Sequence, residues 1–208
     1  MNPVLKAEDV RKSYGRHQVL RGVDLTVAPG QLVAVVGENG AGKSTLLNCL
    51  AGTLVADHGR IDLNGTLGHC PQEPVLSGSL TVEQHLRYFA AAYRLSTMDS
   101  GVRLVEQLGY TGFLGTPAAD LSGGTRQKLN LTLALLHEPD VLLLDEPYQG
   151  FDWETYLRFW DLVRDLRTGG TAIVIITHLV FEQDRFDTLA DLTDGRLTAR
   201  AEIGSTHA

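Results

Sequence analysis

Apolar residues follow two spacings along the chain, one typical of strands and the other typical of helices. Between residues 4 and 30 they alternate loosely with polar residues, which predicts half-buried antiparallel strands that end at the turn Pro29-Gly30. Three shorter runs, residues 32–36, 141–144 and 171–176, are instead apolar on both faces, as buried parallel strands are. The pattern therefore predicts two kinds of strand, of which the second belongs to a parallel sheet.

Helical spacing of apolar residues occurs next to these buried strands. Leu46, Leu47 and Leu50 predict a helix over residues 44–51, packed on the strand that precedes it. A further helix is expected over residues 154–166, between the last two buried strands. Strands that alternate with helices in this way indicate a parallel sheet flanked by helices.

The remaining segments complete the expected architecture. Residues 74–137 have apolar positions at helical spacing and predict a mostly helical insertion, while residues 61–65 resemble a strand ending in a turn. Asp194-Gly195 predicts a hairpin-like turn. We expect an α/β fold with a mainly parallel sheet flanked by helices, an N-terminal antiparallel β subdomain and an inserted α-helical subdomain. Residues 1–208 are expected to form a single domain.

Composition mainly excludes classes of partner. Lys and Arg number 18 against 25 Asp and Glu, the net charge is −7, and there is no basic stripe, so nucleic acid is not an expected partner. The apolar runs are too short to cross a bilayer, and the N-terminus lacks the layout of a secretion signal, so we expect the chain to stay in the cytosol. Cys49 and Cys70 have no metal or redox spacing and are expected to be structural.

A phosphate-binding pattern lies between a predicted buried strand and a predicted helix. The segment Gly37-Glu38-Asn39-Gly40-Ala41-Gly42-Lys43-Ser44 matches G-x-x-x-x-G-K-[ST]. Its glycines allow backbone N–H groups to approach phosphate oxygens closely. Lys43 places a charge on the β and γ phosphates and is a catalytic candidate, and the Ser44 hydroxyl is a candidate Mg²⁺ ligand. Thr45, next along the chain, is included among the nucleotide-binding residues.

Two acidic residues follow the buried strand at residues 141–144. Asp145 emerges at the carboxyl end of that strand, where ligands bind to parallel sheets, and would hold Mg²⁺ directly or through water. Glu146 is next along the chain and can orient a water as general base. Together with the phosphate-binding pattern, these residues predict a P-loop NTPase core, which so far could be a nucleotide hydrolase or a kinase.

The stretch Leu121-Ser122-Gly123-Gly124 separates these two possibilities. A Ser-Gly-Gly helix start offers a hydroxyl and free N–H groups at the positive end of a helix dipole, which makes a second anion site. The stretch resembles the signature motif of the ATP-binding cassette (ABC) family, whose other motifs follow in the family's order over about residues 4–198. A kinase would need neither this stretch nor Glu146.

The resemblance assigns roles to residues that would mean little alone. Tyr14 matches the aromatic residue that stacks on adenine, and Asp152 matches the aspartate of the loop that follows Glu146. Gln72 matches the glutamine that links the nucleotide to the transport partner, and it is carried over as a catalytic residue and a Mg²⁺ ligand. His178 matches the catalytic histidine that contacts the γ-phosphate. The alternatives are a sheet-covering aromatic residue for Tyr14, a solvated turn residue for Gln72 and a core histidine for His178.

Four positions depart from the family pattern. Thr125 stands where the commonest signature has Gln, and Phe151 replaces a common leucine. Tyr148 and Gln149 replace a pair that is usually small and polar. Because the phosphate-facing groups come from other residues, we expect hydrolysis to survive these changes, with its rate left open.

In the resembling family, two cassettes pack head to tail around two ATP molecules. The resemblance implies that Ser122, Gly123 and Gly124 close over a γ-phosphate that Lys43 of a partner chain holds, in a homodimer or a heterodimer. Hydrolysis would remove this bridge and separate the pair. The resemblance also implies a separate transmembrane permease docked near Gln72, and a peripheral location on the cytoplasmic face of the plasma membrane.

The expected function is therefore that of an ATP-hydrolysing subunit that powers transport, with the cargo unknown. A short helical segment and no C-terminal regulatory domain are more typical of compact exporter cassettes than of sugar importers. Leu76, Leu80 and Val82 are candidates to line the groove for the permease, with core packing as the alternative. ABC proteins of ribosomes or DNA usually have tandem cassettes, coiled coils or basic arms, and inert cassettes usually lack the equivalents of Lys43 or Glu146.

Overall fold

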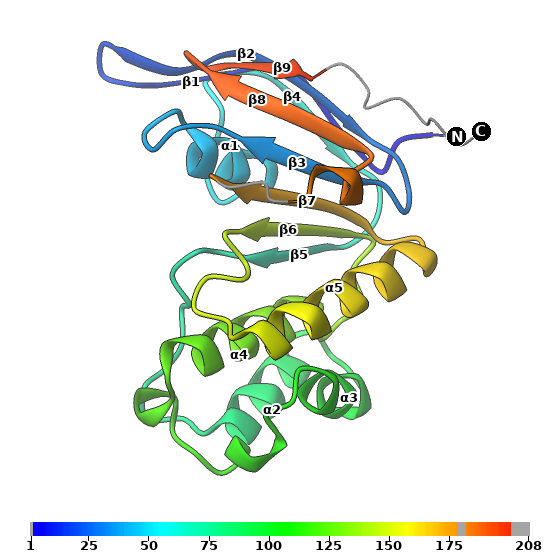
Figure 1. Cartoon of the computed structure of the whole chain (residues 1–208). Helices are drawn as coiled ribbons and strands as arrows, with labels where there is room; N and C mark the ends of the chain where they lie inside the picture. Colours follow the sequence, from blue (N-terminus) through cyan, green and yellow to red (C-terminus); the bar gives the residue numbers. More distant parts are fainter. Residues whose placement is uncertain (1, 179–181, 201–208) are drawn as a thin grey trace, which may run out of the picture.

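The computed structural model describes residues 2–178 and 182–200, and its strands form two sheets (Figure 1). The smaller sheet is antiparallel, in the order β2 (His17–Val27), β1 (Leu5–Tyr14) and β4 (His58–Leu63). Buried and exposed residues alternate along much of β2, as expected for a sheet with one covered face. This is the predicted N-terminal antiparallel subdomain, joined by the strand predicted near residue 61.

The larger sheet has six strands, in the order β5 (Leu67–Cys70), β6 (Val141–Asp145), β7 (Ala172–Thr177), β3 (Leu32–Val36), β8 (Thr188–Thr193) and β9 (Arg196–Ala199). Neighbouring strands are parallel except for β8 and β9. Val36 pairs with Thr177 and Asp145 pairs with Ile176, so β3, β6 and β7 end at the same edge. Functional side chains that follow these strands are thereby brought together.

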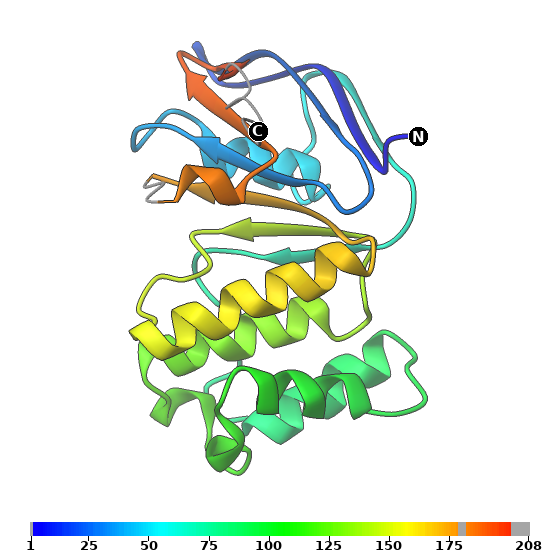
Figure 2. The same ribbon diagram turned by 45° about the vertical axis from the view of Figure 1, so that its right-hand side comes forward.

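Helices cover both faces of the larger sheet (Figure 1, Figure 2). They are α1 (Lys43–Leu50), α2 (Val82–Ala92), α3 (Asp99–Gln107), α4 (Gly123–Leu135) and α5 (Trp153–Thr168). Because side chains alternate along a strand, Val141 and Leu143 of β6 pack with α1 and the antiparallel sheet, whereas Leu142 and Leu144 pack with α4 and α5. The predicted α/β fold, with a mainly parallel sheet flanked by helices, is confirmed.

The predicted insertion at residues 74–137 contains α2, α3 and α4. Helix α2 begins with a capping box, in which the Thr81 hydroxyl accepts from the backbone N–H of Gln84 and the Gln84 side chain accepts from that of Thr81. The buried apolar side chains of these three helices belong to the same apolar cluster as one face of the sheet. Val82 is fully buried in that cluster, so core packing, and not a partner groove, explains this residue.

The sequence pattern predicted neither β5 nor the two strands β8 and β9. Strand β5 has only four residues, with Gly68 and His69 at its centre, so it shows no apolar run and is defined by its pairing with β6. Strands β8 and β9 lie on either side of the predicted turn, where Asp194 and Gly195 both have positive φ. The turn was predicted correctly, but the mixed polarity of its flanking strands hid them.

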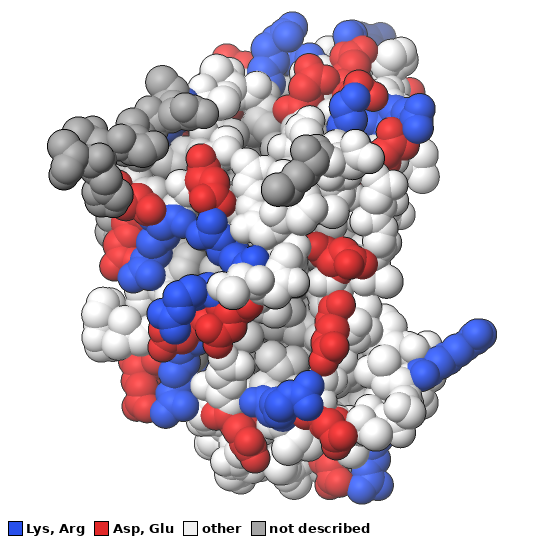
Figure 3. All heavy atoms as spheres, turned by 90° about the vertical axis from the view of Figure 1, so that its right-hand side faces the viewer, with Lys and Arg blue, Asp and Glu red and all other residues white. Residues whose placement is uncertain are grey.

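Basic and acidic side chains are interspersed on the face shown in Figure 3. Many such groups form ion pairs, as do Arg158 with Glu154 and Arg167 with Asp187, each with a closest N···O distance of 2.6 Å. Within residues 2–178 and 182–200, no helix combines the length and the apolar character needed to cross a membrane.

Candidate active site

The phosphate loop, residues 37–42, connects β3 to α1. Gly42 caps α1 with a φ of 99° and Gly40 has a φ of 85°, a left-handed conformation that glycine adopts without steric cost. A Cβ atom on Gly42 would lie 2.7 Å from Cγ1 of Val19, and one on Gly37 would lie 2.6 Å from the carbonyl oxygen of Leu192. Both ends of the loop are therefore enclosed, while residues 38–40 at its tip are exposed.

Lys43 is the first residue of α1, and its side chain turns back into the phosphate loop. Its Nζ donates to the carbonyl oxygens of Gly37, at 2.7 Å, and Glu38, at 2.9 Å. Only 8% of the residue is exposed. The ammonium charge is thus held inside the loop, at the positive end of the α1 dipole, where it would face a bound phosphate.

Asp145, at the end of β6, is buried next to Ser44. The pKa of its carboxyl is raised, mainly by burial. A hydrogen bond with Ser44 opposes this shift, as does the charge of Lys43, whereas the nearby Glu146 adds to it. The Ser44 hydroxyl and the Asp145 carboxylate are hard oxygen donors of the kind that Mg²⁺ uses together with substrate phosphates. This donor set fits the cation that the sequence predicts, which would also offset the crowding of two acidic side chains.

Glu146 adopts a φ of 48°, which is unusual for a residue with a side chain. Its backbone N–H donates to the carbonyl oxygen of Ile176 at 2.9 Å, which fixes the start of the turn against β7. Its Oε1 lies 2.9 Å from the backbone nitrogen of His178 and 2.7 Å from Nδ1 of the same residue. The structure therefore brings together the predicted general base and the predicted γ-phosphate histidine, whose side chain is half exposed.

A cavity of about 480 Å³ lies at the shared carboxyl edge of β3, β6 and β7. The predicted site residues that line it are Asn39, Gly40, Gly42, Lys43, Ser44, Thr45, Gln72, Asp145, Glu146 and His178. Four chain segments that are far apart in the sequence thus meet around a space large enough for the phosphates of a nucleotide.

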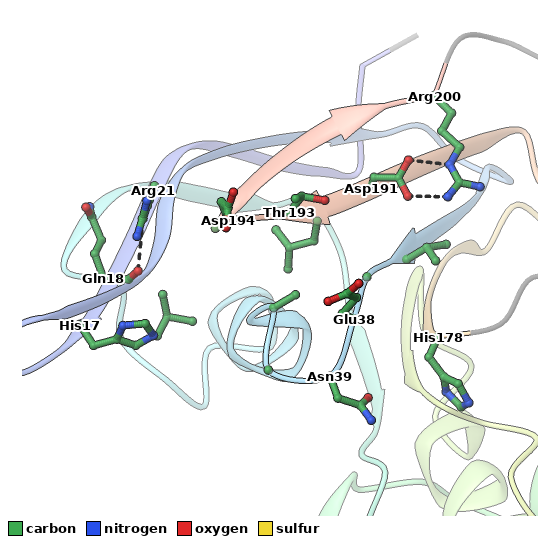
Figure 4. Close-up of a pocket in the computed structure, with 17 residues that line it drawn as sticks. His17, Gln18, Arg21, Glu38, Asn39, His178, Asp191, Thr193, Asp194 and Arg200 are labelled. Atoms are coloured by element: carbon green, nitrogen blue, oxygen red, sulfur yellow. Dashed lines mark hydrogen bonds and ion pairs between the residues drawn. The ribbon is translucent and has the colours of Figure 1, made fainter.

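A neighbouring cavity of about 720 Å³ adjoins the phosphate loop (Figure 4). The predicted residues Gly37, Glu38 and Ala41 line it, and so do Asn39, Gly40 and His178, which it shares with the first cavity. Tyr14, the predicted adenine-stacking residue, lies at the end of β1, is 54% exposed and lines neither cavity. Its ring is accessible from solvent, and stacking on adenine stays a prediction.

The signature stretch forms the start of α4. Ser122 caps this helix, with its Oγ accepting from the backbone N–H of Thr125 at 3.2 Å, and both Ser122 and Gly123 are exposed. Among the described residues that line the phosphate cavity, none belongs to this stretch. Gly124 instead lies against the loop after Glu146, because a Cβ atom on it would lie 2.5 Å from the carbonyl oxygen of Gly150.

Asp152 caps α5, and this is the role that the structure gives it. Its Oδ1 accepts from the backbone N–H of Thr155 at 2.7 Å, a hydrogen bond that holds the pKa of the carboxyl below its usual value. Asp152 does not line the phosphate cavity. Its predicted contact with nucleotide stays a prediction, and an aspartate two residues before the expected helix was the available signal for capping.

Two residues that line the phosphate cavity were not among the sequence-based candidates. Val19 of β2 covers the Gly42 end of the loop, and Gln149 lies between the phosphate cavity and the start of α4. In the sequence, Gln149 stands out only as a departure from the family pattern. Its position three residues after Glu146 was the available signal, whereas nothing in the local sequence marks Val19.

Comparisons with known proteins agree with this geometry. A family model described as ABC transporter matches residues 20–149. Nod factor export ATP-binding protein I of Cupriavidus metallidurans is 33% identical over 200 residues, which cover 89% of this chain and 66% of that protein. The probable multidrug ABC transporter ATP-binding protein YbhF of Escherichia coli is 32% identical over 94% of this chain and 36% of its own length. The chain thus spans about two thirds of the first relative and about one third of the second.

Solved structures show the same fold. A structure described as the ATP-binding subunit of an ABC transporter matches with a TM-score of 0.89 and 29% identity, over 96% of this chain and 90% of that one. A dimeric bacterial ABC transporter cassette matches with a TM-score of 0.87 and 21% identity, over 96% of this chain and 99% of that one. The chain belongs to the ABC transporter family and has the family's ATPase cassette.

Proposed function

We propose that residues 1–208 act as one cassette that powers transport across a membrane, by ATP-driven pairing with a second cassette. The observation that carries this proposal is the position of the signature stretch. Ser122 and Gly123 are exposed, and they lie outside the cavity that Lys43, Ser44 and Glu146 of the same chain line. A helix start that can bind an anion, and that does not line the phosphate cavity of its own chain, fits the phosphate of another chain.

The partner in this scheme is a cassette of the same kind, either a second copy or a related chain. In a symmetric pair, Lys43 of each protomer would face Ser122 of the other, so both sites form in the same event. ATP favours the closed pair because only its γ-phosphate can contact both surfaces, and hydrolysis removes that contact. The dimeric cassette that shares this fold supports the arrangement.

Within each site, different residues have different roles in ATP hydrolysis. Ser44 and Asp145, with Gln72 on the same cavity wall, would hold Mg²⁺, which neutralises phosphate charge when it is bound. Lys43 orients the phosphates, and Glu146 accepts the proton of the attacking water. His178, hydrogen-bonded to Glu146, would contact the γ-phosphate.

The transport partner would be a separate transmembrane permease that binds the chain at the cytoplasmic face of the membrane. Gln72 lies between the phosphate cavity and a second cavity of about 430 Å³, which Leu76 of the helical segment also lines. A permease contact at this second cavity would therefore be sensed next to the nucleotide. A relative named for Nod factor export supports export as the direction.

The test of the shared site separates ATP binding from ATP hydrolysis. Asp caps helices as well as Ser does, so Ser122→Asp keeps the start of α4 intact while placing a carboxylate against the partner's γ-phosphate. We expect Ser122→Asp to bind ATP like the wild type and to lose most hydrolysis, whereas Lys43→Ala loses both. Normal hydrolysis by Ser122→Asp would contradict the shared site, and so would loss of ATP binding by this variant.

The test of the transport role uses the membranes of the native cell. The chain, purified by affinity from detergent-solubilised membranes, is expected to retain a polytopic protein, and ATP-trapped Glu146→Gln is expected to retain it as well. A chain found wholly in the soluble fraction, with no membrane protein attached, would contradict coupling to a permease.

A further inference from the structure

The turn that follows Glu146, the predicted general base, contains a tyrosine, Tyr148. Tyr148 is half-buried, and its backbone carbonyl accepts from the N–H of Phe151 at 3.1 Å, while the N–H of Gln149 donates to the carbonyl of Glu146 at 3.2 Å. These bonds form a compact turn at the carboxyl end of β6. The family pattern usually has a small polar residue at this position, so Tyr148 is a departure from that pattern.

A run of hydroxyl groups connects this tyrosine to the Glu146 carboxylate. The Tyr148 hydroxyl donates to Oγ1 of Thr177 at 2.9 Å, and the Thr177 hydroxyl donates to Oε2 of Glu146 at 3.4 Å. An ionised carboxylate can only accept, so Thr177 has to donate to it and can then accept from Tyr148. The direction of both hydrogen bonds is fixed by this chemistry.

The Tyr148 ring is held by the aromatic face of α5. It packs edge-to-face on Tyr156 and Phe159, with ring centroids 5.7 and 5.8 Å apart, and lies tilted against Trp160 at 6.3 Å. Phe159 is fully buried, as is Thr177 at the end of β7. Burial, the largest influence, raises the pKa of Tyr148 to about 12, so its hydroxyl keeps its proton near neutral pH.

We infer that Tyr148 is a positioning residue for Glu146, acting through the Thr177 hydroxyl, and that α5 holds Tyr148 in place. With His178 on Oε1 and Thr177 on Oε2, both carboxylate oxygens have a partner, so the carboxylate cannot turn freely toward or away from the attacking water. Glu146 has a left-handed backbone conformation, and these two contacts hold its side chain in one direction. The inference rests on the proposed role of Glu146 as general base.

The test removes one hydroxyl at a time in the full chain and measures steady-state ATP hydrolysis. Tyr148→Phe keeps the packed ring and loses the donor, so we expect kcat to fall by about three- to ten-fold with an unchanged KM for ATP, the size of one lost hydrogen bond. Tyr156→Phe is the matched control, because Tyr156 belongs to the same aromatic cluster and not to the run of hydroxyl groups. Its kcat should equal that of the wild type.

A second pair of variants tests the intermediate hydroxyl. Thr177→Val should lower kcat as Tyr148→Phe does, and Thr177→Ser, which keeps the hydroxyl, should restore it. Melting temperatures would show whether a variant is merely unfolded, and rescue by serine would not occur for a role in packing alone. Equal kcat for Tyr148→Phe and Tyr156→Phe would overturn the inference, as would parallel changes in kcat and KM.

The variant Glu146→Gln distinguishes failure of the proposed general base from failure of the positioning role of Tyr148. If Glu146→Gln hydrolyses ATP at the wild-type rate, the proposed general base is wrong, and the inference about Tyr148 falls with it. If Glu146→Gln is inactive while Tyr148→Phe matches Tyr156→Phe, only the positioning role of Tyr148 is wrong.

Discussion

Gly123 and Gly124 are neighbours in the signature stretch, but their surroundings differ. A Cβ atom on Gly123 would meet no atom within 4 Å apart from its chain neighbours and the nearby backbone of its own helix, whereas one on Gly124 would lie 2.5 Å from the carbonyl oxygen of Gly150. Gly124 therefore allows the backbone of α4 to contact the loop that follows Glu146, and Gly123 has open space before it. Gly124 is thus required for packing within the chain, whereas Gly123 leaves the start of α4 accessible from outside.

This difference predicts opposite effects of two alanine substitutions on stability. Gly124→Ala would push the start of α4 away from the backbone of Gly150, and we expect it to lower the free energy of unfolding by about 1–3 kcal/mol. Gly123→Ala lies in the first turn of α4 without a clash, so stability should be unchanged or slightly higher. Urea unfolding of both variants measures the effect. Equal destabilisation of the two would show that the contact with Gly150 does not decide the choice of glycine.

At the scale of single residues, the site was predictable where one motif contains the information. Lys43, Ser44, Asp145 and Glu146 follow strands whose ends had been predicted, and the structure brings them to one cavity. Tyr148 could not be assigned in this way, because its partner is 29 residues away in the sequence and the two meet only through the register of neighbouring strands.

At the scale of elements, strand β5 is defined by its contacts with neighbouring segments and not by an apolar pattern of its own. It lies at the edge of the larger sheet, its four residues lead to Gln72, and its start is fixed by Asp140, just before β6. The Asp140 carboxylate accepts from the backbone N–H of Thr66 at 2.7 Å and from its hydroxyl at 2.9 Å. Gly65 leaves room for this contact, since a Cβ atom there would collide with the carboxylate. A pattern of apolar residues cannot reveal a strand that is defined by such contacts.

These hydrogen bonds predict a stability effect that depends on pH. They hold the pKa of Asp140 below its ordinary value of 3.8, so their contribution is fully present above that value and is lost as the pH falls through the lower, folded pKa. Asp140→Ala should therefore melt at a lower temperature than the wild type at pH 7, by a margin that shrinks at pH 3.

The control for this prediction is Asp161→Ala. Asp161 forms an exposed ion pair with Arg164 on α5, a kind of contact that contributes little to stability, so its melting temperature should stay close to that of the wild type at both pH values. A margin for Asp140→Ala that grows toward pH 3 would show that the sign is wrong.

For the molecule as a whole, the layered arrangement could be predicted because buried strands and helices alternate in the sequence. Two apolar clusters, one on each face of the larger sheet, follow directly from the alternation of side chains in β3, β6 and β7. The proposed pairing of two molecules is different, because it would depend on a surface that the chain leaves exposed. The exposed position of Ser122 is a property of the single chain, and its partner has to be shown in solution.

The most direct measurement is the mass of Glu146→Gln in solution, by light scattering during size-exclusion chromatography with saturating ATP and Mg²⁺. Pairing of two copies of this chain predicts twice the 22.6 kDa of one chain with ATP, and 22.6 kDa with ADP or when Ser122→Asp is added to the same variant. A mass of 22.6 kDa for Glu146→Gln with ATP would contradict pairing of this chain with itself. A dimer that forms equally well with Ser122→Asp would contradict the contact between Ser122 and the partner's nucleotide.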